Sequence, residues 1–164
     1  MNRLAWRGSW IGFVFMALPP MAHTEDPANG FEKLKNLAGE WEAELDGGHL
    51  VRSSYRLISN GTAVIESIND ATHEDMVTIY HPDGGELRAV HYCSSANQPR
   101  LDAVWEGETL AFSMVDVTNL TEPGQRHIRR ITFRFEDRDH YMQEWTQREN
   151  GEDSVDTLRF VRKK

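Results

Sequence analysis

The sequence contains a single cysteine, few basic residues and no long apolar run. With only Cys93, no disulfide can form within the chain, so a packed core must stabilise the fold. Lysine and arginine total 18 against 26 aspartate and glutamate, giving a formal net charge of −8. Nucleic-acid surfaces need clustered lysine and arginine, so we expect no nucleic-acid partner. The longest apolar run, "WIGFVFMAL", is shorter than the roughly 20 residues of a membrane-spanning helix.

The first residues have the pattern of a secretory signal peptide. Arg3 and Arg7 precede the short apolar run, and small residues follow near "AHT". We therefore predict a signal peptide over residues 1–24 and a periplasmic or secreted protein without a transmembrane segment in its mature form. A polar leader over 25–30 and a single domain over 31–164 complete the predicted organisation.

The remaining sequence predicts an all-β domain. Phe31, Leu34 and Leu37 have helical spacing, and Gly39 follows as a stop. Beyond Gly39 the residues alternate between apolar and polar, interrupted by turn sequences such as "DGG", "SNG" and "ENG". The predicted strands cover residues 39–45, 49–58, 62–68, 76–81, 86–93, 100–105, 109–116, 127–135, 139–146 and 155–161. About ten short strands with tight connections favour an antiparallel up-and-down barrel, with an open sandwich as the alternative.

The alternation also predicts which side chains enter the barrel. In an up-and-down barrel successive connections alternate between the two ends, and one end receives the longer set, including "SSANQP" and "TNLTEPGQR". Longer loops usually frame the opening, so we expect the mouth there and the short helix at the closed end. The strands at 62–68 and 76–81 are ambiguous, because both of their faces carry apolar residues.

Several polar and aromatic residues are predicted to face inward and to form a ligand site. The predicted ligand-binding residues are Tyr55, His91, Cys93, Trp105, His127, Arg129, Phe133, Gln143 and Trp145. An arginine among apolar side chains needs an anionic partner. Arg129 therefore favours either an anionic group on a small, partly apolar ligand or an internal acid such as Asp116.

The first predicted strand resembles a known signature. "LAGEWEAEL" carries Gly39-x-Trp41, which resembles the Gly-x-Trp signature of calycins, a superfamily that includes lipocalins, fatty-acid-binding proteins and nitrobindin-like barrels. The resemblance implies that the tryptophan packs at the closed end beneath a basic residue of the last strand, here Arg162 or Arg159. Residues 31–162 as a whole resemble bacterial lipocalin-like barrels of unknown function.

Two other functions are weighed against simple binding. His91, His127 and Cys93 could hold zinc or serve an acid–base or haem-dependent enzyme. The nitrobindin-like resemblance would imply haem on an inward histidine, but the sequence after Trp41 reads "EWEAELDGG" where those proteins have a glycine-rich stretch. No standard catalytic motif is present, so no cofactor is favoured. A filled barrel that acts only through its surface is the third alternative.

Overall fold

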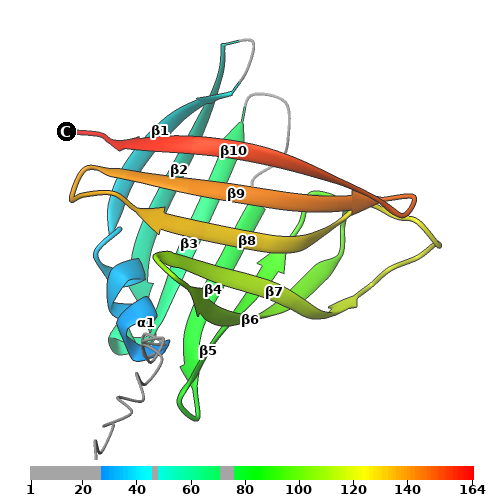
Figure 1. Cartoon of the computed structure of the whole chain (residues 1–164), viewed down its shortest axis with the longest axis horizontal. Helices are drawn as coiled ribbons and strands as arrows, with labels where there is room; N and C mark the ends of the chain where they lie inside the picture. The colour runs from blue at the N-terminus through cyan, green and yellow to red at the C-terminus, as the bar shows by residue number, and fades with distance from the viewer. Residues whose placement is uncertain (1–26, 46–47, 71–75) are drawn as a thin grey trace, which may run out of the picture.

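The computed structural model describes residues 27–45, 48–70 and 76–164, and within them the chain forms a closed antiparallel barrel of ten strands. Each strand pairs with its neighbours in sequence, and the last strand pairs with the first (Figure 1). The strands are β1 (Gly39–Leu45), β2 (His49–Ile58), β3 (Ala63–Asp70), β4 (Met76–Asp83), β5 (Glu86–Tyr92), β6 (Gln98–Glu106), β7 (Thr109–Thr118), β8 (His127–Phe135), β9 (His140–Glu149) and β10 (Glu152–Arg162).

The predicted fold class is confirmed: the domain is all-β, with a ten-stranded up-and-down barrel and one short helix before it. Every predicted strand overlaps an observed one, because alternation and turn residues both act locally. A short 3₁₀ turn, η1 (Ser59–Gly61), joins β2 to β3. No helix in the described parts of the chain is long and apolar enough to cross a membrane.

The helix α1 (Pro27–Lys35) covers one end of the barrel. It begins within the segment predicted as a polar leader, and its first residue is a proline, which fits the first turn of a helix because the missing N–H has no partner there. Phe31 and Leu34 are buried in the barrel core. Figure 1 shows α1 at the end where β10 finishes, whereas the long β7–β8 connection lies at the opposite end. The predicted signal peptide, residues 1–24, lies outside the described residues.

Trp41 and Arg162 close the end of the barrel beside α1. The Trp41 ring is fully buried, and the Arg162 guanidinium lies 4.1 Å from the ring centre. Arg162 also donates hydrogen bonds to the carbonyl oxygens of Asn36, Ala38 and Arg138, at 2.9, 2.9 and 3.1 Å. One side chain therefore ties the end of β10 to the segment between α1 and β1 and to the β8–β9 connection.

The approach of Arg162 also explains the glycine that begins β1. Gly39 has a φ of +129°, and a Cβ atom there would lie 3.0 Å from the Arg162 Nη1 atom. A residue with a side chain would be strained by its backbone conformation and would press on the guanidinium. The Gly39-x-Trp41 pattern therefore has a local physical cause in this barrel.

We expect Arg162→Ala to lower the free energy of unfolding by about 3 kcal/mol, because it removes charge-assisted hydrogen bonds and the contact with the Trp41 ring. Urea unfolding followed by circular dichroism measures the change. The matched control is Arg159→Ala on the same strand. The Arg159 side chain is 72% exposed and lies 3.7 Å from Glu136, so its loss should cost less than about 0.5 kcal/mol. Equal losses in the two variants would contradict this account of the closed end.

Candidate functional site

A pocket of about 300 Å³ opens at the end of the barrel opposite α1. It lies at the end predicted to be the mouth, where β1 meets β2 and β5 meets β6. More than half of its lining residues are apolar: Leu45, Val51, Ile68, Met76, Ile128, Trp145 and Leu158. These side chains come from seven of the ten strands, so the pocket is the upper part of the barrel interior and not a groove on its outside.

The polar lining of the pocket lies mainly along one wall. Arg126, just before β8, donates to the Gln147 side chain on β9, and Gln147 donates to Asp156 on β10 at 2.5 Å. His49, Cys93 and Ser94 complete the polar lining. The arginine and the aspartate have opposite charges and share one amide between them, so the rim has no net charge from this wall.

Trp145 and His91 lie together at the base of the pocket. Trp145 lines the pocket, and its ring centre is 5.0 Å from that of His91 in an edge-to-face arrangement. His91 is fully buried, and its Nδ1 atom lies 2.9 Å from the Thr78 hydroxyl. Burial lowers the pKa of His91 to about 3, so the ring is neutral at neutral pH.

Below this layer, a buried glutamate occupies the middle of the barrel. Glu66 on β3 is fully buried and accepts hydrogen bonds from Tyr55 and Tyr80, both at 2.6 Å, and from Ser53 and Gln143, both at 3.2 Å. These donors come from β2, β4 and β9, so the carboxyl joins opposite walls of the barrel. Because four donors point at one carboxyl group, little of its hydrogen-bonding capacity is left unused.

Among the described residues, the Glu66 carboxyl has hydrogen-bond donors around it but no cation that lowers its pKa. Burial raises the pKa of Glu66, although the hydrogen bonds from Tyr55, Tyr80 and Gln143 act in the opposite direction. Burial and the nearby Glu66 carboxyl also raise the pKa of Tyr55 and Tyr80 well above the usual value of a tyrosine. The two phenols therefore remain protonated and act as donors.

The Tyr55 hydroxyl extends this network toward the closed end. It lies 3.0 Å from the Tyr141 hydroxyl, and the Tyr141 ring packs edge-to-face on Trp41 with ring centres 4.8 Å apart. Since Tyr55 donates its proton to Glu66, Tyr141 is the donor in the bond between the two phenols. The polar layer around Glu66 is therefore in direct contact with the aromatic floor, the Trp41 and Tyr141 rings at the closed end.

Glu66 is the residue that the sequence interpretation missed. Its strand was ambiguous, since Val64 and Ile68 share the face of Glu66 while Ile65 supplies an apolar residue to the other face. The usable signal was the sequence Val64-x-Glu66-x-Ile68, in which an acid occupies an apolar stripe at a spacing of two residues. The inward tyrosines of the neighbouring strands, Tyr55 and Tyr80, could have been recognised as its partners.

Among the predicted ligand-binding residues, the structure places four at or just below the pocket. Cys93 and Trp145 line it, and His91 and Gln143 are fully buried on the inner faces of their strands. Tyr55 and Phe133 lie deeper, within the buried core.

Trp105 packs against the core, as its predicted inward orientation requires, but it does not line the pocket. It lies beside Lys33 and Phe135, next to α1 at the closed end. The strand does carry Trp105 toward the core, as its alternation indicates, but at the end remote from the mouth.

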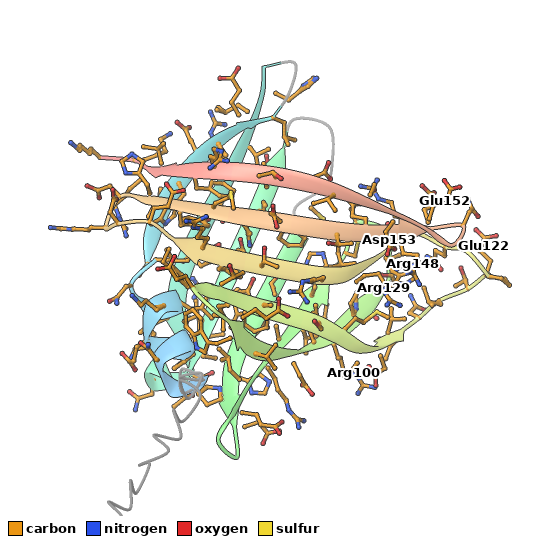
Figure 2. The ribbon with its side chains drawn as sticks, in the orientation of Figure 1. Arg100, Glu122, Arg129, Arg148, Glu152 and Asp153 are labelled. Atoms are coloured by element: carbon orange, nitrogen blue, oxygen red, sulfur yellow. The ribbon has the colours of Figure 1, made fainter. Side chains whose placement is uncertain are left out.

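The predicted inward orientation of His127 and Arg129 is also wrong. A β-bulge between Ile128 and Arg130 adds one residue to β8, so Ile128 lines the pocket and the two flanking side chains turn outward. Arg129 lies near Asp153 on the barrel exterior, where Arg148 donates to that carboxylate at 2.7 and 2.8 Å. Figure 2 shows Arg129, Arg148 and Asp153 close together, at the end of the barrel away from α1.

Because of the bulge, neither the proposed His91–His127–Cys93 site nor the proposed inward Arg129 site forms. Because His127 turns outward, it does not join His91 and Cys93, and the three-residue metal or acid–base site is not assembled. No group of three or more histidine, cysteine or acidic side chains in the described residues could hold a metal ion. Asp116, the acid considered as a partner for Arg129, is half-exposed and pairs with Arg100 instead.

Comparison with known proteins adds support for the fold alone. No family model matches the chain, and no curated protein matches it. Among solved structures, it is similar to the crystal structure of a protein of unknown function from the DUF3598 family of Nostoc punctiforme, with a TM-score of 0.55 and 12% sequence identity. The match covers 79% of this chain and 49% of that one, so this chain spans about half the length of its structural neighbour. The likeness to calycins drawn from Gly39-x-Trp41 stays a prediction.

The lowered pKa of His91 predicts how acid destabilises the barrel. The folded protein holds fewer protons at this site than the unfolded chain between pH 6.5 and about 3. The stability that neutral His91 provides is therefore complete above pH 6.5 and is lost as the pH falls toward 3. We expect His91→Gln to reduce this loss and to lower the pH at which the protein unfolds.

Unfolding by urea at a series of pH values measures this effect. The control is His49→Gln, which alters an exposed histidine at the start of β2 and should leave the slope between pH 6.5 and 3 unchanged. The raised pKa of Glu66 has the opposite effect on stability, which it lowers as the pH rises. Glu66 is present in both variants, so its effect is the same in each. An acid transition identical in His91→Gln and the unmodified protein would show that His91 is not the group responsible.

Proposed function

We propose that this barrel binds a small, partly apolar molecule in the pocket at its mouth. The observation that carries the proposal is the pocket itself, an apolar chamber of about 300 Å³ within the barrel, with polar side chains along one wall. Its size is at the lower end of that usual for small-molecule sites, and its mixture of apolar surface with a few polar groups is typical of them.

The layer beneath the pocket supports the same proposal. The polar network of Glu66 and the aromatic core occupy the barrel interior below the pocket. A ligand of limited length would therefore enter from the mouth and stop at Trp145. A metal- or haem-dependent enzyme is less well supported, because His91 has neither His127 nor Cys93 in direct contact with its ring nitrogens among the described residues.

We also propose that the protein is exported to the periplasm or the exterior. The proposal rests on the basic start, short apolar run and small residues of positions 1–24. Sequencing the N-terminus of the protein recovered from its host tests this, and a protein that retains residues 1–24 would contradict it.

The neutral fluorescent probe N-phenyl-1-naphthylamine tests the binding proposal. We expect saturable binding, because an apolar, uncharged molecule of this size matches the pocket lining. Leu158→Trp should abolish binding, since Leu158 lines the pocket and is only 4% exposed, so that the larger side chain fills the space. The matched control is Val104→Trp, which places the same side chain at a 52% exposed position on β6.

Cys93 gives a second readout of the same site. It is the only cysteine in the chain and it lines the pocket, so a bound probe should slow its alkylation by N-ethylmaleimide. Probe binding that is unchanged by Leu158→Trp, together with unaltered alkylation of Cys93, would contradict the proposed site. Failure of the probe to bind at all would favour the filled barrel that acts only through its surface.

A further inference from the structure

On β9, two buried polar atoms near the base of the pocket have no hydrogen-bond partner among the described residues. They are Gln143 Oε1 and Trp145 Nε1, which occupy successive inward positions of β9. Trp145 lines the pocket, and Gln143 lies one inward position deeper, in the polar layer around Glu66. Buried polar groups in folded proteins are almost always hydrogen-bonded, so this pair indicates the chemistry of a missing partner.

The hydrogen-bonding role of each atom is fixed by its chemistry. The Gln143 amide nitrogen donates to both carboxyl oxygens of Glu66, at 3.2 and 3.5 Å, which leaves its Oε1 atom as an acceptor. The indole nitrogen of Trp145 can only donate. A group that satisfies both atoms must therefore donate one hydrogen bond and accept another. His91 Nε2 is also unpartnered and lies on the ring that packs against Trp145.

The charges around this position disfavour an anion. The Glu66 carboxyl lies directly beneath Gln143, and the buried His91 ring contributes no positive charge. The inward cation expected from the sequence, Arg129, lies on the exterior because of the β8 bulge. Arg126 is at the rim and is engaged with Gln147. A carboxylate entering the pocket would therefore approach an internal acid without a cation at its base.

We propose that the ligand carries an un-ionised hydroxyl group, which donates to Gln143 Oε1 and accepts from Trp145 Nε1. The inference rests on the proposed function and specifies the class of ligand: an alcohol with an apolar body that occupies the chamber above. Both atoms are covered by protein, so we infer that binding includes a turn of the Trp145 ring. A carboxylate has no hydrogen to donate to Gln143, and an ammonium group has no lone pair to accept from Trp145.

Displacement of N-phenyl-1-naphthylamine by four compounds of equal chain length tests the proposal at pH 7.5. The compounds are 1-octanol, 1-methoxyoctane, octanoate and octylammonium. We expect 1-octanol to displace the probe at a concentration at least tenfold lower than either ion and at least fivefold lower than 1-methoxyoctane. The ether is the decisive comparison, because it is more apolar than the alcohol and carries a methyl group in place of the hydrogen that Gln143 would accept.

Two tryptophan variants then locate the hydroxyl group. Trp145→Phe removes the donor, which an alcohol oxygen can accept and an ammonium group cannot, so the advantage of 1-octanol over octylammonium should fall at least threefold. Trp105→Phe is the matched control: its Nε1 atom is also buried and unpartnered, but it lies beside α1 at the other end of the barrel, so the advantage should persist.

Several results would overturn the inference. One is that octanoate, octylammonium or 1-methoxyoctane displaces the probe from the unmodified protein at the same concentration as 1-octanol. This comparison does not depend on whether the variants fold. An unchanged advantage of 1-octanol over octylammonium in Trp145→Phe would overturn it as well. These outcomes differ from failure of the proposed function, in which the probe itself does not bind or binds independently of Leu158.

Discussion

The organisation of this barrel depends on how one buried carboxyl group, Glu66, is hydrogen-bonded. An acid in an apolar interior is costly unless donors surround it. Here the donors come from β2, β4 and β9, so satisfying the acid requires opposite walls of the barrel to approach one another. The network fills the middle of the interior and separates an aromatic floor from a hollow mouth. A hydrophobic residue at position 66 would leave two tyrosines and a glutamine without their acceptor.

The two ends of the barrel, on either side of the Glu66 network, differ in structure. At the closed end, Arg162 lies over Trp41 and bonds three backbone carbonyl groups, so a charged side chain stabilises the junction of helix and barrel. At the open end, the interior contains a pocket of about 300 Å³, which Trp145 lines, and His91 packs against the Trp145 ring. The same inward face of β9 contributes to each level, with Tyr141 at the floor, Gln143 in the polar layer and Trp145 at the pocket.

The strands and their order could be predicted because they depend on local signals. Alternation and turn sequences such as "SNG" and "ENG" act over a few residues, and a meander joins each strand to its neighbours in sequence. The helix start was less accurate, since Pro27 begins α1 within a segment whose polar composition resembles a leader.

The candidate site could be predicted only in part, and the errors have identifiable causes. A β-bulge adds one residue without any distinctive composition, so the alternation counted through Arg129 assigned His127 and Arg129 to the wrong face. Glu66 was missed because its strand is apolar on both faces and its partners lie far away in sequence. Burial of an acid depends on tertiary contacts between β3 and β9, which no local pattern contains. The inward orientation of Gln143, His91 and Trp145 was predicted correctly, because their strands alternate without interruption.

Native mass spectrometry of the protein purified from its own host, without detergent, tests the central claim most directly. The claim is that the mouth pocket holds a small, uncharged, partly apolar molecule above the Glu66 network. The account predicts one additional organic mass on the folded protein, released on unfolding and identified as an un-ionised hydroxyl compound. A bound carboxylate, metal or haem, or a folded protein whose mass is that of the polypeptide alone, would contradict it.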